Sequence, residues 1–176
     1  MIKERFITYV EDSIKKNWNK EALSNYREKG YTYKEIAEMI VSHHIFFQEL
    51  GIKEGDKIAL VGRNSANWCA MYLAVVTYGA IVVPILPDFR PEDMMNIINH
   101  SDSKLIFIDD KLWEGLESDR LKEIMCAVSL DAFDITMSRA EKYAVAYNAK
   151  KALFGKKYPD FKQEDIKFSG KYQLIH

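Results

Sequence analysis

Phosphate binding is the first chemistry that this sequence suggests, because one loop places small and cationic residues between two apolar runs. That loop is Gly62-Arg63-Asn64-Ser65. A phosphate site needs backbone N–H groups converging on the anion at a helix start, which normally takes several glycines close together. Asn64 or Ser65 could cap the following helix, whereas Arg63 could face an anion. Capping is the favoured interpretation, because no G-x-G-x-x-G or G-x-x-x-x-G-K-[ST] spacing occurs among the glycines, which lie at 30, 51, 55, 62, 79, 115, 155 and 170.

Histidines and aspartates suggest metal binding or acid–base chemistry. His43-His44 fall next to each other on an expected helix, so they point in different directions, and no acidic or Cys partner lies one turn away. His100 lies near an expected helix end and His176 is the last residue, and neither has a visible catalytic partner. Asp109-Asp110 follows an expected strand at the edge where open α/β sheets bind ligands. Helix capping by Asp110 is the favoured alternative there.

The remaining nucleophiles give no catalytic pattern. Cys69 and Cys126 match neither a disulfide framework nor a zinc site, and Cys69 lies in an apolar run, which indicates a reducing, cytoplasmic setting. Ser and Thr occur without the strained elbow or triad context that would pair them with a base. We therefore assign no residue of this chain a catalytic, cofactor-binding or metal-binding role.

The composition is that of one soluble globular domain. The chain has 176 residues, 25 Lys and Arg against 26 Asp and Glu, and 48% hydrophobic residues. A formal net charge of -1, with scattered lysine pairs, provides no field that would attract nucleic acid. The charged N-terminus lacks the apolar stretch of a signal peptide.

An uncharged segment from Asn64 to Pro87 imitates a membrane span in length. Gly79 interrupts it, however, and the β-branched residues after it are closed by Pro84. A buried helix over about 66 to 78, a turn at Gly79 and a buried strand over about 80 to 84 explain these residue types better than one long helix.

The N-terminal third is expected to be mainly helical. Apolar residues four apart predict an amphipathic helix over 4 to 18 that acts as a clasp. A short hairpin is expected around a turn in which Gly30 takes a positive φ. Thr32 and Glu35 form a T-x-x-E capping box. This box predicts a helix over 33 to 50, ended by Gly51.

Strands then alternate with helices. Such alternation requires crossover connections, so the expected fold class is α/β, a mostly parallel sheet flanked by helices on both faces. Pro91 is expected at a helix start and Asp110 as the cap of a helix that runs to about Met125. The expected strands cover 57 to 62, 80 to 84, 104 to 108 and 127 to 130, and the expected helices cover 66 to 78, 91 to 100 and 110 to 125.

The last part of the chain changes character. Ser138 and Glu141 suggest a second capping box for a polar, Ala-rich helix through about Phe154, ended by Gly155. Residues 166 to 168 and 172 to 175 alternate like edge strands, and the chain stops with an apolar segment that looks unfinished. We expect two parts, an α/β subdomain over 1 to 135 and a helix with a short strand over 136 to 176.

Five segments occur in this order: Tyr31 to Ile36, Leu50 to Leu60, Asn64 to Trp68, Tyr72 to Ala74 and Tyr78 to Pro84. Together they resemble the start of the AMP-forming acyl-CoA synthetases, the adenylate-forming ligases. The resemblance covers roughly residues 20 to 110, and residues 158 to 168 also resemble bacterial long-chain fatty acid CoA ligases. Asn67 departs from the family, which usually has an acidic residue there, on what is expected to be a scaffold helix.

The resemblance implies a fatty acid CoA ligase that uses ATP, magnesium and CoA. In the full-length parent the fatty carboxylate would attack the α-phosphate of ATP, and the CoA thiolate would then displace AMP. The family's T-S-G-T-T-G-like phosphate loop would follow a strand such as 173 to 176, so this chain is expected to be the catalytically incomplete N-terminal scaffold. The parent's location is expected to be cytoplasmic, with association at the membrane periphery left open.

Two alternatives remain from the residues. A stand-alone binding or self-association module would use apolar surface and strand edges left without a continuation of the sheet. A Rossmann-like nucleotide-binding domain is disfavoured by the glycine spacing.

Overall fold

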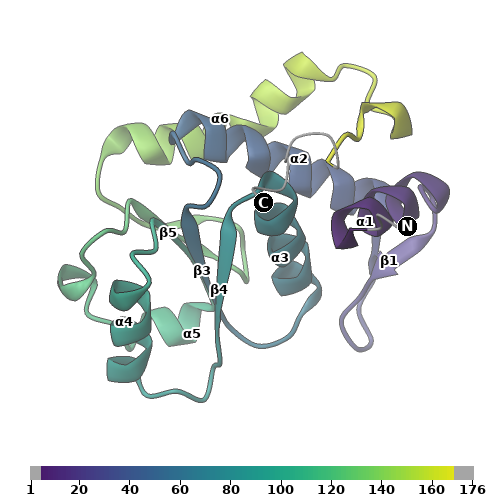
Figure 1. Ribbon diagram of the computed structural model, residues 1–176. Coiled ribbons are helices and arrows are strands. Elements are labelled where there is room, and N and C mark those ends of the chain that lie inside the picture. Colours follow the sequence, from purple (N-terminus) through teal and green to yellow (C-terminus); the bar gives the residue numbers. More distant parts are fainter. Residues whose placement is uncertain (1–4, 169–176) are drawn as a thin grey trace.

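The computed structural model describes residues 5–168, which form a five-stranded sheet between two layers of helices (Figure 1). The strand order is β4-β3-β5-β6-β7, with parallel pairing throughout except for the antiparallel pair β6–β7. This confirms the expected mostly parallel α/β fold. The strands are β3 Lys57–Val61, β4 Ile81–Ile85, β5 Leu105–Ile108, β6 Cys126–Ser129 and β7 Ile135–Ser138.

Alternate residues of the central strands feed two separate cores, because successive side chains of a strand point to opposite faces. Ile58 and Leu60 of β3 face the larger core, which is covered by the helices α1, α2, α3 and α6. Ala59 and Val61 face the smaller core under α4. The helices are α1 Phe6–Lys16, α2 Tyr33–Glu49, α3 Ala66–Tyr78, α4 Pro91–His100, α5 Asp110–Trp113 and α6 Glu141–Lys157.

Local signals place the start of α2, the ends of α2 and α3 and the start of α4 as expected. The Thr32 and Glu35 capping box is present in full at the start of α2, and Pro91 is in the first turn of α4. Gly51 and Gly79 adopt φ of 74° and 94°, so each ends its helix in the left-handed region. Within residues 5–168, no helix combines the length and apolarity needed to cross a bilayer, in agreement with the division of the uncharged segment into α3 and β4.

The hairpin of β1 Glu21–Leu23 and β2 Tyr31–Thr32 forms, but the expected role of Gly30 is wrong. The positive φ of this turn, 62°, belongs to Arg27. Gly30 is instead needed for space, because a Cβ there would lie 2.7 Å from the carbonyl oxygen of Leu23.

Three expectations for the second half of the chain are corrected. The helix expected to run from 110 to Met125 ends at Trp113, and only a short 3-10 turn, Ser118–Arg120, follows. The second capping box is absent: Ala140 precedes α6 without a side-chain cap, and the Ser138 hydroxyl donates to the Ala140 carbonyl oxygen. Gly155 lies inside α6 and does not end it.

The sheet edges also differ from the expectation. β4 is at the edge of the sheet and is only partly buried. Pro84 suits this position, because it has no N–H to donate to a further strand. β7 was not expected at all, and the proposed division after residue 135 falls at its start. Ile166 and Phe168 form no strand but are buried in the larger core, after the 3-10 turn Gln163–Asp165. The strand expected over 172 to 175 lies outside the described residues.

Candidate functional site

The carboxyl edge of the parallel strands is where this fold would bind a ligand. The chain leaves β3 for β4 on one side and returns from β4 to β5 on the other side of β3. The crevice between the ends of β3 and β5 is therefore the topological switch point, the usual ligand position in open α/β sheets. The loops that meet there begin with Gly62 and Asp109.

Asp109 places its own carboxylate at this point of the sheet edge. Its Oδ2 accepts the backbone N–H of Arg63 at 2.9 Å, the kind of donor that a bound phosphate would use. A Cβ on Gly62 would lie 2.6 Å from Oδ1 of Asp109, so glycine at this position is required by the approach of the carboxylate. Burial, with the charges of Asp131 and Asp110, raises the pKa of Asp109, although the Arg63 N–H opposes the shift.

In the neighbouring loop, backbone N–H groups are likewise bonded to side-chain oxygens of the chain itself. Oδ2 of Asp131 accepts the backbone N–H of Asp110 at 2.8 Å. The Ser129 hydroxyl in turn accepts the N–H groups of Asp131 and Ala132. The expectation that the Asp110 side chain caps the helix is therefore wrong: Asp110 is the first residue of α5, and Asp109 precedes it without a side-chain cap.

The loop before α3 is a capping loop, as favoured from the sequence. Oγ of Ser65 accepts the N–H of Trp68 at 3.1 Å. Oδ1 of Asn25, on the hairpin turn, accepts the N–H of Ala66 at 2.9 Å. Two of the N–H groups that an anion would need at this helix start are thus bonded to the protein itself.

Asn67 is a contributor to this edge whose contacts sequence reasoning missed. From the scaffold helix α3, its Oδ1 accepts the hydroxyl of Tyr31 at 2.8 Å and its Nδ2 donates to the Leu130 carbonyl oxygen at 2.7 Å. A carboxylate could accept from the tyrosine but could not donate to the carbonyl. The departure of this position from the family's acidic residue was the available signal.

The adjacent histidines, His43 and His44, are both buried and bond within the core. Nδ1 of His43 donates to the Met39 carbonyl oxygen at 2.7 Å, and Nε2 faces the Tyr147 hydroxyl at 3.4 Å. Burial, followed by the charge of Lys150, lowers the pKa of His43 to about 3. His44 Nε2 lies 2.9 Å from the carbonyl oxygen of Ala74.

The other side chains that could take part in chemistry, the remaining histidines and the two cysteines, form no reactive cluster among the described residues. No cluster of His, Cys, Asp or Glu within residues 5–168 could hold a metal ion. His100 is exposed in the last turn of α4, and His176 lies outside the described part of the chain. Burial raises the pKa of Cys69, and that of Cys126 to about 12, so both thiols are poor nucleophiles at neutral pH.

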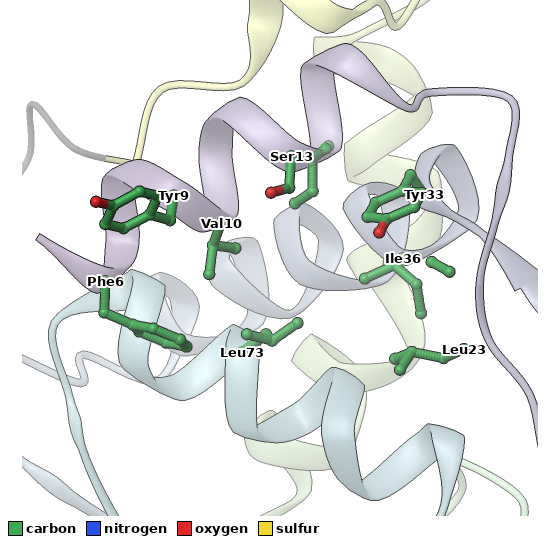
Figure 2. A pocket seen from close by; sticks show the side chains of 10 residues that line it. Phe6, Tyr9, Val10, Ser13, Leu23, Tyr33, Ile36 and Leu73 are labelled. Atoms are coloured by element: carbon green, nitrogen blue, oxygen red, sulfur yellow. The ribbon is translucent and has the colours of Figure 1, made fainter. Parts of the chain in front are cut away.

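An apolar groove of about 310 Å³ lies between α1, the hairpin, α2 and α3. Figure 2 shows Phe6, Val10 and Ser13 directed from α1 toward Leu73 of α3, with Tyr33 and Ile36 entering from α2. Its polar groups are hydroxyls, and none of the described side chains that line it is charged. This groove therefore offers contact surface and no acid–base or phosphate chemistry.

Comparison with known proteins agrees with this fold and also identifies a family. The family model described as AMP-binding enzyme matches residues 10–167. The solved structure of the anthranilate CoA ligase AuaEII in complex with anthranoyl-AMP superposes with a TM-score of 0.68 at 17% identity, covering 84% of this chain and 27% of that one. At this identity the superposition establishes the fold.

Curated relatives are similar over about half of the chain. A 4-hydroxybutyrate–CoA ligase 2 of Metallosphaera sedula is 31% identical over 91 residues, which is 52% of this chain and 17% of the relative. A long-chain-fatty-acid–CoA ligase of Thermus thermophilus is 31% identical over 84 residues, 47% of this chain and 16% of the relative. The chain thus matches only a small part of each relative's length, and by the family match it belongs to the AMP-binding, adenylate-forming enzymes, of which it represents the N-terminal portion.

Proposed function

We propose that this chain is the N-terminal supporting part of an AMP-forming acyl-CoA ligase that acts on a fatty acid. Two of the similar relatives are carboxylate–CoA ligases, one of them specific by name for long-chain fatty acids. The parent reaction would join a fatty carboxylate to AMP with loss of pyrophosphate, and CoA would then displace AMP. Fatty acid, ATP, magnesium and CoA are the partners of that parent.

The observation that carries the supporting role is the carboxylate of Asp109 in the switch-point crevice. A triphosphate at this point would have to displace the Arg63 N–H bond and would meet the negative charges of Asp109, Asp110 and Asp131. Like charges brought together in this way disfavour binding strongly. The groups that stabilise the reacting phosphates are therefore proposed to lie outside these 176 residues.

Within residues 5–168, no group of three His, Cys, Asp or Glu side chains could hold a metal ion between them. What this part of the chain contributes is a rigid sheet with its loops fixed by their own carboxylates.

Calorimetric titration of the purified chain with MgATP tests this proposal. We expect no binding heat and no increase in thermal stability at about 1 mM nucleotide. A ligand present at a hundred times its Kd would stabilise the fold by about 2.7 kcal/mol, an effect that is easily measured. Saturable binding in the micromolar range that is lost in Arg63→Ala would contradict the supporting role and revive the nucleotide-binding alternative.

A further inference from the structure

The helix α6 carries a positive charge that the rest of the chain does not share. It contains five lysines and one acidic residue, Glu141, whereas the whole chain has a formal net charge of -1. Lys150 is partly buried, with its Nζ 3.5 Å from the centre of the Tyr147 ring, so it belongs to the packing of the helix. The other four lysines are exposed: Lys142, Lys151, Lys156 and Lys157.

The exposed lysines are not neutralised within the fold. Among residues 5–168, no lysine of α6 forms an ion pair. Lys142 lies over the ring of its neighbour Tyr143 at 5.4 Å, a contact that keeps the charge in place. Glu49, which lines the same hollow as Lys142, and Glu141 offset part of the charge. The remaining charge is available to an anionic partner.

The opposite side of the molecule is acidic. Residues 86–134 contain twelve Asp and Glu residues against five Lys and Arg residues. This segment includes α4 and α5, which Figure 1 shows at the lower margin, whereas α6 runs along the upper margin. The small net charge therefore hides a strong separation of charge. An anionic surface would attract the α6 side and repel the α4 side, so the approach of the molecule would be oriented.

Aliphatic side chains lie between lysines on one face of α6. Residues three or four apart share a helix face, and this face runs Lys142, Val145, Ala149, Leu153, Lys156. Val145 is 57% exposed and Leu153 is 36% exposed. A hollow of about 330 Å³ beside them is also lined by Leu50 and Met125, which widens the apolar surface. The face thus has an apolar middle with a cation at each end.

We propose that this face of α6 docks on the surface of an anionic lipid bilayer. Lys142 and Lys156 contact the headgroup phosphates, and their aliphatic stems lie along the interface beside Val145 and Leu153. Helices that lie on membranes combine these two kinds of group, because their binding grows with the apolar area buried and with the attraction to anionic lipids. A cluster of four or more lysines on such a helix is typical of binding to acidic lipids.

The aliphatic middle is what favours a bilayer over a soluble polyanion. Nucleic acid or heparin would use the lysines but would leave Val145 and Leu153 in water, and α6 contains no arginine. The contact is one helix wide and includes few large aliphatic side chains, so the binding is weak, reversible and dependent on salt. This inference does not depend on the proposed ligase function.

Flotation of the whole chain with large unilamellar vesicles tests the proposal. We expect binding to vesicles of equal parts phosphatidylcholine and phosphatidylglycerol at about 25 mM NaCl, and none to pure phosphatidylcholine. Affinity should fall at least about tenfold at about 300 mM NaCl, because salt screens exposed charges. Lys142→Glu combined with Lys156→Glu should weaken binding by at least about tenfold. The matched control is Lys111→Glu with Lys122→Glu, at exposed positions of the acidic side, which changes the net charge equally and should leave binding unchanged.

A second double variant separates a bilayer from other polyanions. Val145→Ser with Leu153→Ser keeps every lysine, so it should weaken vesicle binding about threefold to tenfold and leave any retention on heparin unchanged. The circular dichroism of each variant reports that the fold is intact. The proposal is overturned if the chain does not bind anionic vesicles at low salt, binds both kinds of vesicle equally, or is indifferent to the lysine substitutions. A serine variant that binds vesicles as the wild type does would assign this face to a soluble polyanion instead.

Discussion

Asp109 shows how a residue type that suggests chemistry can serve architecture. At the end of a parallel strand, an aspartate is equally suited to contact a ligand or to hold its own loop. The structure gives it the second task, since Oδ2 accepts the Arg63 N–H and Gly62 leaves the space for it. The arrangement has an electrostatic cost, because burial and two neighbouring carboxylates raise the pKa of Asp109.

That cost predicts the effect of Asp109→Asn. A carboxyl whose pKa is raised in the folded state favours folding when protonated, and this contribution is lost as pH rises from its ordinary value of 3.8 through the folded value. The side-chain amide that replaces the carboxylate would keep an acceptor for the Arg63 N–H and carry no charge. The stability of the variant relative to wild type should therefore increase between about pH 4 and 7 in urea denaturation. Asp88→Asn, at an exposed site, is the control and should show no such trend.

His43 predicts the opposite dependence on pH. Its pKa is about 3 in the folded protein against an ordinary 6.5, so the unfolded chain takes up a proton first as pH falls. Stability is lost from pH 6.5 downward, with a slope approaching about 1.4 kcal/mol per pH unit for one proton. His43→Phe should remove this component of the urea midpoint's pH profile, whereas His100→Gln at an exposed position should retain it. An unchanged profile in His43→Phe would mean that the buried imidazole is not the group responsible.

At the scale of elements, the sequence predicted the helix ends and strands that are determined by neighbouring residues. The capping box of α2, the left-handed glycines at 51 and 79, and the apolar runs of β3 and β5 were all recognisable, because each is specified by a few neighbouring residues. The capping role favoured for the loop before α3 belongs to the same class, since Ser65 is the residue whose side chain bonds to the helix.

Ser65→Ala tests that assignment. Loss of an N-cap hydroxyl should reduce the free energy of unfolding by about 1 kcal/mol. Asn64→Ala, one position earlier and exposed, should change it by less than about 0.5 kcal/mol. Equal losses in the two variants, measured by urea denaturation, would show that the cap is shared and would weaken the structural interpretation of this loop.

The elements that sequence reasoning missed are those held by distant contacts. The segment after Trp113 is apolar at helical spacing, yet it is drawn out along α4: Arg120 pairs with Glu92 at 2.6 Å, and the Arg139 guanidinium donates to the Leu121 carbonyl oxygen at 2.9 Å. Such tertiary contacts override local propensity. Phe168 is similar, because its N–H donates to the buried carboxylate of Glu11 on α1, which no local pattern reveals.

In the candidate site, too, features set by neighbouring residues could be predicted and contacts between distant residues could not. The carboxyl edge of the sheet could be located from the alternation of strands and helices. The glycine positions alone already exclude the two glycine-rich phosphate-loop spacings. That Asp109 reaches across to Arg63, and that Asn67 joins Tyr31 to Leu130, could not be predicted, since these partners are 46, 36 and 63 positions apart in the chain.

At the scale of the whole molecule, the chain is a sheet with two cores, and side chains of Ser65, Asp109 and Asp131 bond to backbone N–H groups of the loops at its carboxyl edge. The family match and the coverage of 17% and 16% of two relatives fit a supporting part of a larger adenylating enzyme.

The most direct test of the central claim is fatty-acid-dependent exchange of labelled pyrophosphate into ATP, measured with the purified chain, magnesium and saturated fatty acids of short to long chain length. An intact chain, verified by its circular dichroism and cooperative unfolding, is predicted to give no exchange above a protein-free blank, while a complete long-chain-fatty-acid–CoA ligase assayed in parallel gives a clear signal. Exchange that requires both this chain and a fatty acid, and that falls in Asp109→Ala or Arg63→Ala, would show that these residues perform the chemistry that the account assigns elsewhere.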